Sequence, residues 1–326
     1  MPAKLRGALL GYGAMGRIHA ACYAKQKNVE LAAVCDTDPD AFTQDEGKTG
    51  LAGVAKYRSF NELMRRGGFD FLDICLPTHL HAEYAVRAMK EGCHVLCETP
   101  MARTPDQADR MIRIARETDR KLMIAQCLRF APNYAKLKTH IETGTFGRLL
   151  RLDLRRHSAL PTKKWVLDPA KSGGALLELH LQDTDCVNWL FGLPVSVRTY
   201  GIVRDTGGID DLMTAYQYKR NGPVVTAEAS WCRGKRLCTV TAVFQQATAE
   251  LTDFDRMTIC RPGQEDEEIR FERNSDPYFN EIASFAECIV KNRTPEQCTP
   301  LSTRNSIRLA AAEERSARAR RSIRLD

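Results

Sequence analysis

Apolar and polar positions follow two different patterns along the chain, and the first third alternates strand-like with helix-like segments. Short apolar runs predict strands at residues 5–10, 30–35, 71–76, 94–97 and 122–126. Helical spacing predicts helices between them at residues 16–25, 38–47, 60–66, 81–90 and 105–118. This order favours an α/β domain built on a parallel, doubly wound sheet.

From about residue 125 the pattern changes to longer strand-like runs. They occupy residues 149–155, 195–204, 212–218, 224–231, 238–244 and 247–251, and helices are predicted at 134–143, 174–191, 278–291 and 302–320. Apolar and polar residues alternate in several runs, which indicates a sheet with one covered and one freer face. The expected domains are therefore 1–124 and a C-terminal α/β domain, 125–326, with a large, open, mostly antiparallel sheet.

Charge and hydropathy exclude some classes of partner. The net charge of +7 over 326 residues is modest and favours small anions, and no basic run with interleaved aromatic residues predicts nucleic-acid binding. Arginines near the C-terminus are interpreted as a solvated helix face and end strand, with a partner surface as the alternative: Arg315, Arg318, Arg320, Arg321 and Arg324. No apolar run approaches the roughly 18 residues that cross a membrane, and the glycines before residue 17 argue against a secretion signal.

Twelve cysteines are scattered without any C-x-x-C pair. This pattern predicts reduced, buried thiols in a reducing compartment, and hence a cytoplasmic protein, rather than a disulfide framework. Cys75, His79 and His81 lack a matching pair of ligands elsewhere in the sequence, so no metal site is predicted.

The strongest motif follows the first predicted strand and opens the first predicted helix. It comprises Gly11, Tyr12, Gly13, Ala14, Met15 and Gly16. In a G-x-G-x-x-G turn the first glycine permits the tight turn, the second admits a diphosphate and the third allows close packing of helix on strand. The helix N-terminus then offers N–H groups to the phosphates. The sequence predicts a Rossmann domain that binds a dinucleotide.

Asp36 ends the second predicted strand, twenty residues after Gly16. A carboxylate at this spacing can accept hydrogen bonds from the adenosine ribose. Thr37 and Asp38 follow, without an Arg or Lys to meet a 2′-phosphate, so NAD is predicted and NADP is less favoured. The alternative is a turn or helix-capping aspartate without a ligand.

The order of several segments resembles that of the Gfo/Idh/MocA family (glucose–fructose oxidoreductase / inositol dehydrogenase-like oxidoreductases). Besides the glycine turn, the segments that carry the resemblance are 73–81 (DICLPTHLH), 94–100 (HVLCETP), 129–130 (RF) and 173–185 (GGALLELHLQDTD). The resemblance covers nearly the whole chain. It implies a nicotinamide-dependent oxidoreductase that acts on a CH–OH group of a sugar, cyclitol or sugar derivative.

The resemblance also implies where ligands bind. Cofactor contacts would come from Leu76, Pro77, Thr78, His81, Glu98 and Gln126, and substrate contacts from Arg129, Lys164, Trp165 and Asp183. Glu98 would lie near the nicotinamide ribose. For His81 the alternative is a structural hydrogen bond at a helix end, and for Trp165 it is a place in the core.

Three positions depart from the family pattern. The usual Lys, Asp and His are replaced by Thr99, Glu178 and Gln182. Oxidation of a carbinol needs a base with a pKa near the working pH, which neither a hydroxyl nor an amide provides. Thr99 and Gln182 can still orient a polyol through hydrogen bonds.

Several groups remain as candidate bases. Glu178 is a carboxylate four residues before Gln182, on the same side of an ideal helix, and burial can raise the pKa of a glutamate. His180 has a suitable ordinary pKa but points to another side of that helix. Lys163 or Lys164 could come from the preceding loop, and the absence of any base is the remaining alternative.

Three functions follow from these alternatives. The first is an NAD-dependent oxidoreductase with an atypical active site, in which Glu178, Gln182, Thr99 and His180 are the candidate catalytic residues. The second is a sensor or partner-binding protein that holds NAD without turnover. The third is a lyase, epimerase or hydrolase that uses NAD transiently. The resemblance further implies a homo-oligomer, dimer or tetramer, formed through the C-terminal sheet.

Overall fold

The computed structural model describes residues 4–43, 51–253, 255–272 and 276–325, and the chain folds as two compact units. The first unit comprises Met1–Ala102, Asp106–Cys127 and Asp276–Arg304. The second comprises Arg103–Pro105, Leu128–Ser275 and Asn305–Asp326. A segment near the end of the chain therefore belongs to the first unit. The predicted domain boundary at residue 124 did not include this return of the chain to the first unit. The predicted boundary stays a prediction.

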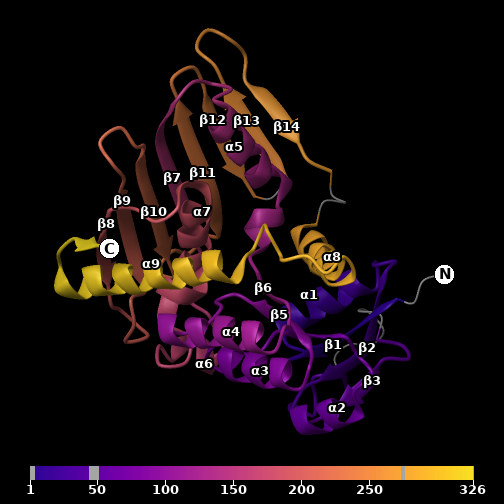
Figure 1. Ribbon diagram of the computed structural model, residues 1–326. Coiled ribbons are helices and arrows are strands. Elements are labelled where there is room, and N and C mark those ends of the chain that lie inside the picture. Colours follow the sequence, from indigo (N-terminus) through magenta and orange to yellow (C-terminus); the bar gives the residue numbers. More distant parts are fainter. Residues whose placement is uncertain (1–3, 44–50, 254, 273–275, 326) are drawn as a thin grey trace. The chain divides into compact units, whose positions relative to one another are not determined.

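A six-stranded parallel sheet forms the centre of the first unit, in the order β3-β2-β1-β4-β5-β6 (Figure 1). Its strands are β1 Leu5–Leu10, β2 Val29–Cys35, β3 Ala55–Tyr57, β4 Phe71–Ile74, β5 His94–Glu98 and β6 Leu122–Ala125. The strand order reverses between β1 and β4, which is the topological switch point where ligands of such sheets bind. The predicted doubly wound sheet is confirmed, and β3, only three residues long, was missed.

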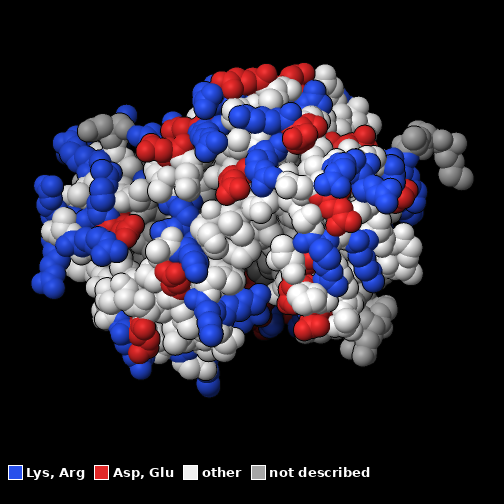
Figure 2. Space-filling view, turned by 90° about the horizontal axis from the view of Figure 1, so that it is seen from below, with Lys and Arg blue, Asp and Glu red and all other residues white. Residues whose placement is uncertain are grey.

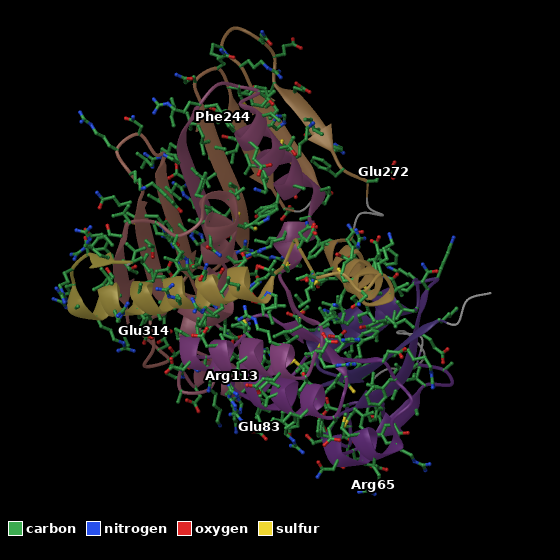
Figure 3. The ribbon with its side chains drawn as sticks, in the orientation of Figure 1. Arg65, Glu83, Arg113, Phe244, Glu272 and Glu314 are labelled. Carbon is green, nitrogen blue, oxygen red and sulfur yellow. The ribbon has the colours of Figure 1, made fainter. Side chains whose placement is uncertain are left out.

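Helices of the first unit pack on this sheet. They are α1 Ala14–Tyr23, α2 Phe60–Arg66, α3 Thr78–Lys90, α4 Pro105–Glu117 and α8 Pro277–Val290. Charged side chains such as Glu83 of α3 and Arg113 of α4 are exposed (Figure 3), whereas Met111 of α4 is fully buried. Helix α8, which follows the second unit's sheet in sequence, packs against α1, β5 and β6.

The helix predicted at residues 38–47 is absent from its described part, 38–43, which forms turns; residues 44–47 lie outside the described residues. The Asp36 and Asp38 side chains explain the turns. They accept hydrogen bonds from the backbone N–H groups two residues further on, at Asp38 and Asp40, over 2.9 Å each. Such local bonds compete with a helix.

The second unit is built on a nine-stranded sheet in the order β14-β13-β12-β11-β7-β10-β9-β8-β15. Its strands are β7 Leu149–His157, β8 Ser196–Ile202, β9 Asp211–Gln217, β10 Val224–Ser230, β11 Leu237–Phe244, β12 Thr248–Thr252, β13 Arg256–Cys260, β14 Glu267–Arg270 and β15 Ile323–Arg324. Neighbouring strands are antiparallel except for β7 and β10. The large, mostly antiparallel sheet is confirmed.

Helices cover one face of this sheet (Figure 1). They are α5 Pro132–Thr143, α7 Leu181–Phe191 and α9 Pro300–Ala319, whose inner residues, such as Leu137, Val187 and Leu309, share one core with the strands. Burial alternates residue by residue along β11. Met213 and Val224 are exposed large apolar residues of β9 and β10.

Charged residues of both signs are interspersed on the surface seen in Figure 2. The five C-terminal arginines are exposed, and Arg318 forms an ion pair of 2.7 Å with Glu314 one turn earlier. Of the helices that the structure describes, none is both long enough and apolar enough to cross a membrane.

Candidate cofactor site and proton-transfer residues

The turn between β1 and α1 has no room for side chains at two of its glycines. Gly11 adopts a φ of +95°, and a Cβ there would lie 2.6 Å from the Cys75 carbonyl oxygen. A Cβ on Gly16 would lie 2.1 Å from the Gly11 carbonyl oxygen. The N-cap residue Gly13 supplies no side-chain hydrogen bond, and the first turn of α1 carries no acidic residue. With Gly13 and Ala14 exposed, this helix end suits an anion.

Asp36 holds the glycine turn in place. One of its carboxylate oxygens accepts a hydrogen bond of 2.6 Å from the Tyr12 N–H, and the other accepts from the Asp38 N–H. The turn role that the sequence left as an alternative is therefore present. Each carboxylate oxygen has a second lone pair, so this role leaves acceptor capacity for ribose hydroxyls.

Two cations near Asp36 were missed because β3 was not predicted. Strand β3 pairs with β2 and brings Lys56 and Arg58 to this end of the sheet. Arg58 donates to the carbonyl oxygens of Asp38, at 2.6 Å, and Pro39, at 2.8 Å, and its guanidinium lies 4.8 Å from the Phe42 ring centroid. The only signal in the sequence was the basic character of residues 56–58, twenty residues beyond Asp36.

His81 ties together the turns that follow β4 and β5. Its Nε2 lies 2.6 Å from the Leu76 carbonyl oxygen, and its Nδ1 lies 2.7 Å from the Pro100 carbonyl oxygen. Burial lowers the pKa of His81, although the hydrogen bonds to the two carbonyl oxygens favour the charged ring and oppose this effect. The structural role is thus observed, and direct cofactor contact stays a prediction. Leu76 and Pro77 lie at the turn that begins α3, with Thr78 buried as its first residue.

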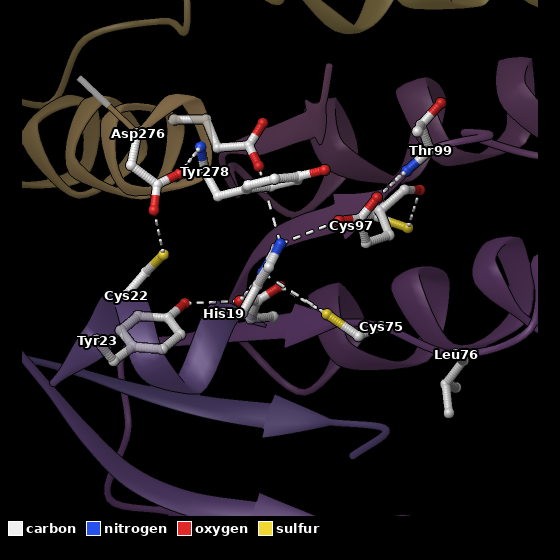
Figure 4. Close-up of polar contacts among 12 residues, drawn as sticks. His19, Cys22, Tyr23, Cys75, Leu76, Cys97, Thr99, Asp276 and Tyr278 are labelled. Atoms are coloured by element: carbon white, nitrogen blue, oxygen red, sulfur yellow. Dashed lines mark hydrogen bonds and ion pairs between the residues drawn. The ribbon is translucent and has the colours of Figure 1, made fainter. Parts of the chain in front are cut away.

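Glu98 and Thr99 mark the carboxyl end of β5. The Glu98 side chain, 6% exposed, accepts a hydrogen bond of 2.9 Å from the Thr99 N–H through Oε2. Its Oε1 lies 2.9 Å from His19 Nε2 (Figure 4). The Thr99 hydroxyl is buried and has no hydrogen-bond partner among the described residues. A buried hydroxyl without a partner is unusual, and it lies where a ligand group could satisfy it. Gln126, which follows β6, is buried.

The predicted helix at 174–191 is two elements. Leu176–His180 forms a π-helical turn, and α7 begins at Leu181. Glu178 and Gln182 are half-buried, whereas His180 and Asp183 are buried. Single π-helical turns occur often at functional sites. The turn presents the two polar residues singled out by sequence on the accessible side of this segment.

His180 packs against a buried acid in the second unit. Its Nε2 lies 3.4 Å from the Tyr216 hydroxyl and 3.7 Å from Glu313 Oε2. Glu313 in turn accepts hydrogen bonds from Tyr216, at 2.8 Å, and from Thr184. Burial raises the pKa of Glu313. A His180 ring at 0% exposure has no direct route to a substrate in this conformation, so its catalytic role stays a prediction.

Arg129 and Asp183, predicted substrate ligands, are members of buried ion pairs. Arg129 donates to both oxygens of Asp185, at 2.8 and 2.7 Å. Arg156 donates to both oxygens of Asp183, at 2.9 and 2.7 Å. Arg129 and Asp183 are each 1% exposed. The structure therefore gives both a place in the core of the second unit, which the sequence did not foresee, and their contact with a substrate is untested.

The remaining predicted residues lie on the short helix α6, Lys164–Leu167. Lys164 is exposed, as is Lys163 just before the helix, and Trp165 is partly buried. None of the twelve cysteines, all within the described residues, forms a disulfide bond, and nine of them are buried.

Metal-ligating side chains come together where the sequence predicted none. His19, Asp73 and Cys75 form one group that could hold a metal ion, and His19, Glu98 and Glu281 form another. Their residues lie on α1, β4, β5, α8 and the turn after β4, so no local spacing announced them.

Comparison with known proteins places the chain among oxidoreductases. The family described as "Oxidoreductase family, NAD-binding Rossmann fold" matches residues 5–126, and the "GFO/IDH/MocA C-terminal domain" matches residues 134–250. The myo-inositol 2-dehydrogenase of Thermotoga maritima is 26% identical over 342 residues, covering 99% of each chain. The D-glucoside 3-dehydrogenase of Escherichia coli is 28% identical over 194 residues, which span 58% of this chain and 55% of that protein.

Solved structures share the whole fold. The WlbA dehydrogenase of Bordetella pertussis, in complex with NADH and UDP-GlcNAcA, is 22% identical, with a TM-score of 0.86 over 100% of this chain and 99% of that one. Together with the glycine turn and the parallel sheet, these matches show that the chain belongs to the Gfo/Idh/MocA family of oxidoreductases, with an NAD-binding Rossmann fold in its N-terminal part.

Proposed function

We propose that the protein is an NAD-dependent dehydrogenase or reductase that acts on a CH–OH group of a sugar, cyclitol or sugar derivative. The observation that carries the proposal is the turn after β1. Gly11 and Gly16 have no space for a Cβ, and the helix end beside them offers backbone N–H groups. Such a turn fits a diphosphate.

The first unit supplies the groups that would hold NAD. Residues 11–16 would bind the diphosphate, and Asp36 would accept hydrogen bonds from the adenosine ribose. Leu76, Pro77, Glu98 and Gln126 stand at or beside the carboxyl ends of strands on the other side of the switch point, where the nicotinamide half would bind. NAD bound there accepts or delivers a hydride, and the chain's own residues handle the proton.

Glu178 is the residue we assign to proton transfer. It is half-buried on the π-helical turn, whereas His180 is enclosed by Tyr216 and Glu313. A glutamate removed from bulk water can take a proton near neutral pH. Gln182 and Thr99 would orient the hydroxyl groups of the substrate through hydrogen bonds.

The substrate class comes from the family. The relatives include a myo-inositol 2-dehydrogenase and a D-glucoside 3-dehydrogenase, both of which act on ring carbinols according to their names. The WlbA structure with NADH supports NAD as the cofactor. Arg58 beside the Asp36 turn is a cation that could meet a 2′-phosphate, so within this chain the preference for NAD over NADP rests on Asp36.

Two further features belong to this proposal. Cysteines that form no disulfide bonds favour a reducing compartment such as the cytoplasm. The exposed Met213 and Val224 of the nine-stranded sheet favour a homo-oligomer formed through that face. Light scattering of the purified protein tests the assembly.

The decisive experiment has two stages. Calorimetry with NADH and NADPH should show micromolar or tighter binding of NADH, and Gly16→Ala should weaken it by about 100-fold, because the added Cβ meets backbone. A screen of cyclitols, sugars and glycosides should then show reduction of NAD, and Glu178→Gln should slow it by about 100-fold or more. Failure of the wild-type protein to bind either dinucleotide would contradict the proposal.

The altered positions favour one alternative, a protein that retains NAD without turnover. Thr99 and Gln182 stand where the family pattern has Lys and His. This alternative predicts bound NAD after purification and no reaction with any screened substrate, even in the double variant Thr99→Lys and Gln182→His.

A further inference from the structure

One buried histidine of the first unit is surrounded by carboxylates. His19 lies on α1 and is 0% exposed. Its Nδ1 is 2.8 Å from Asp73 Oδ2, and its Nε2 is 2.9 Å from Glu98 Oε1 and 3.8 Å from Glu281 Oε1 (Figure 4). Three strands or helices other than its own, β4, β5 and α8, thus place an acid against the same ring.

Both ring nitrogens face acceptors at hydrogen-bond distance. A neutral imidazole carries one N–H and one lone pair, so one carboxylate would face a lone pair across less than 3 Å. An imidazolium donates to Asp73 and forms an ion pair with Glu98, whose contact with Nε2 lies outside hydrogen-bond geometry. Asp73 also accepts from the Tyr23 hydroxyl at 2.8 Å, and its other oxygen faces the Cys75 thiol, which leaves it no proton to give. The charged ring therefore satisfies the geometry best.

Charge neutralisation supports the same state. Although burial lowers the pKa of His19, Asp73 and its hydrogen bond raise it well above the ordinary value. Both oxygens of Glu281 lack a hydrogen-bond partner among the described residues, and the side chain is 0% exposed. Burial, and then the charge of Glu98, raise the pKa of Glu281 well above its ordinary value. The buried set then holds one cation, two carboxylates and one neutral acid.

The other ionisable groups around His19 do not change this balance. Asp276 and Tyr278 of the α8 end, and Cys22 and Tyr23 of α1, complete the surroundings. Burial raises the pKa of both the Tyr23 and the Cys22 side chains, which keeps them neutral. Asp276 accepts from the Tyr278 N–H as the cap of α8.

We propose that His19 is a positioning residue: its ring carries protons on both nitrogens and holds the Glu98 carboxylate in one orientation at the nicotinamide end of the dinucleotide site. The inference rests on the proposed function. Glu98 Oε1 is held by His19 and Oε2 by the Thr99 N–H. The carboxylate that ends β5 is thereby fixed on both sides before any ligand binds.

The same ring links the two halves of the site. Helix α1 begins at the diphosphate turn, and Glu98 ends a strand on the other side of the switch point. His19, two turns into α1, joins these parts through side chains alone. Glu281 of α8 reaches the same point, 3.8 Å from His19 Nε2.

A metal ion is the competing occupant. Histidines that bind a metal often donate their other N–H to a carboxylate, and Asp73 has this position relative to His19. The His19, Glu98 and Glu281 atoms are also close enough together to ligate an ion. The direct contact of 2.9 Å between His19 Nε2 and Glu98 Oε1 favours an ion pair between the two side chains instead.

The charge of His19 is tested first, by ¹⁵N–¹H spectra of histidine side chains in the protein without cofactor. His19→Gln identifies the resonance. We expect protons on both ring nitrogens at pH values well above the ordinary histidine pKa of roughly 6.5, and we expect Glu281→Gln to keep this signature because the amide replaces a neutral acid. A neutral His19 ring at pH 7, or one stoichiometric metal ion per chain by elemental analysis, would overturn the proposal.

The positioning role is tested by the affinities for NADH and ADP-ribose. His19→Gln should weaken NADH binding at least about tenfold, since Glu98 loses its buried ion-pair partner, and ADP-ribose binding by less than about threefold. His140→Gln, which removes another buried histidine from α5 in the second unit, is the matched control and should leave both affinities unchanged.

Equal losses for the two ligands would mean that His19 acts only through the fold of the diphosphate turn. If His19→Gln does not fold, Glu98→Gln serves instead: the His19 ring should then lose its second proton at a lower pH than in the wild-type protein, and an unchanged ring would refute the link. Absence of NADH binding by the wild-type protein would defeat the proposed function, while the spectra would still decide the charge of His19.

Discussion

The two units treat buried charge in opposite ways. In the second unit, Arg129 and Arg156 each donate to both oxygens of one aspartate, so every one of these four charges has a partner. In the first unit, three acids surround the single imidazole of His19. Removing one partner of such a balanced pair destabilises a fold strongly, because it leaves a buried charge without compensation. An excess of buried acid destabilises a fold, and its location at the end of β5 points to function.

The two buried glutamates show the same difference on a smaller scale. Glu313 of the second unit accepts hydrogen bonds from the hydroxyls of Tyr216 and Thr184. Glu281 of the first unit has no such donor among the described residues. Both have a raised pKa, first because of burial. Neutral hydroxyl donors hold Glu313, which makes it part of the scaffold of the second unit. Glu281 has no such donors, so its protonation depends on the charges of its neighbours.

The largest effect is expected from breaking a balanced pair. Arg129→Ala should lower the free energy of unfolding of the second unit by about 3–5 kcal/mol, because Asp185 would stay buried without its partner. Replacing both, as Arg129→Met with Asp185→Leu, should recover most of the loss. Urea unfolding followed by tryptophan fluorescence measures both, and a loss below about 1 kcal/mol in the single variant would show that this pair is not a fold determinant.

A smaller effect should distinguish the first unit by its pH dependence. Since the pKa of Glu281 is raised in the folded state, its contribution to stability is fully present below the ordinary glutamate pKa and is lost as the pH rises through the raised value. Glu281→Gln removes this loss, so above neutral pH the variant should be as stable as the wild-type protein or more stable, by on the order of 1 kcal/mol. Thermal unfolding between pH 6 and about 9 tests this, and a less stable variant throughout would indicate an ionised Glu281 with an unrecognised partner.

Loss of a neutral hydrogen-bond donor to Glu313 should lower the stability of the second unit. Tyr216→Phe removes the hydroxyl that donates to Glu313 at 2.8 Å, and it should cost about 1–2 kcal/mol of stability. Dinucleotide affinity, a property of the first unit, should not change. Calorimetric unfolding with a parallel NADH titration separates the two, and weaker NADH binding would contradict the assignment of Glu313 to the scaffold.

The smallest effect concerns Arg58 beside the Asp36 turn. Arg58→Ala should weaken NADPH binding by about threefold to tenfold, because an exposed cation contributes about 1 kcal/mol towards a phosphate, while NADH binding changes less. Lys90→Ala, on the last turn of α3, is the control for loss of a surface charge. Equal effects of Arg58→Ala on both dinucleotides would remove Arg58 from cofactor choice.

Local sequence determined the diphosphate turn and most strands of both sheets. Gly11, Gly13 and Gly16 act within one strand-to-helix turn, and alternation along 238–244 acts within one strand, so a short window contains the whole signal. The turns at Asp36 and Asp38 were misread as the start of a helix because a side-chain bond to the backbone competed with it.

The sequence by itself therefore determined the fold class, the dinucleotide turn and the residues that depart from the family pattern. Only the tertiary structure decided that His19, Asp73, Glu98 and Glu281 share one buried centre, that Arg58 stands beside Asp36 and that Arg129 belongs to a core ion pair. The reason is physical. Propensity and spacing act over a few residues, whereas the charge state of a buried group depends on which distant segments packing brings against it.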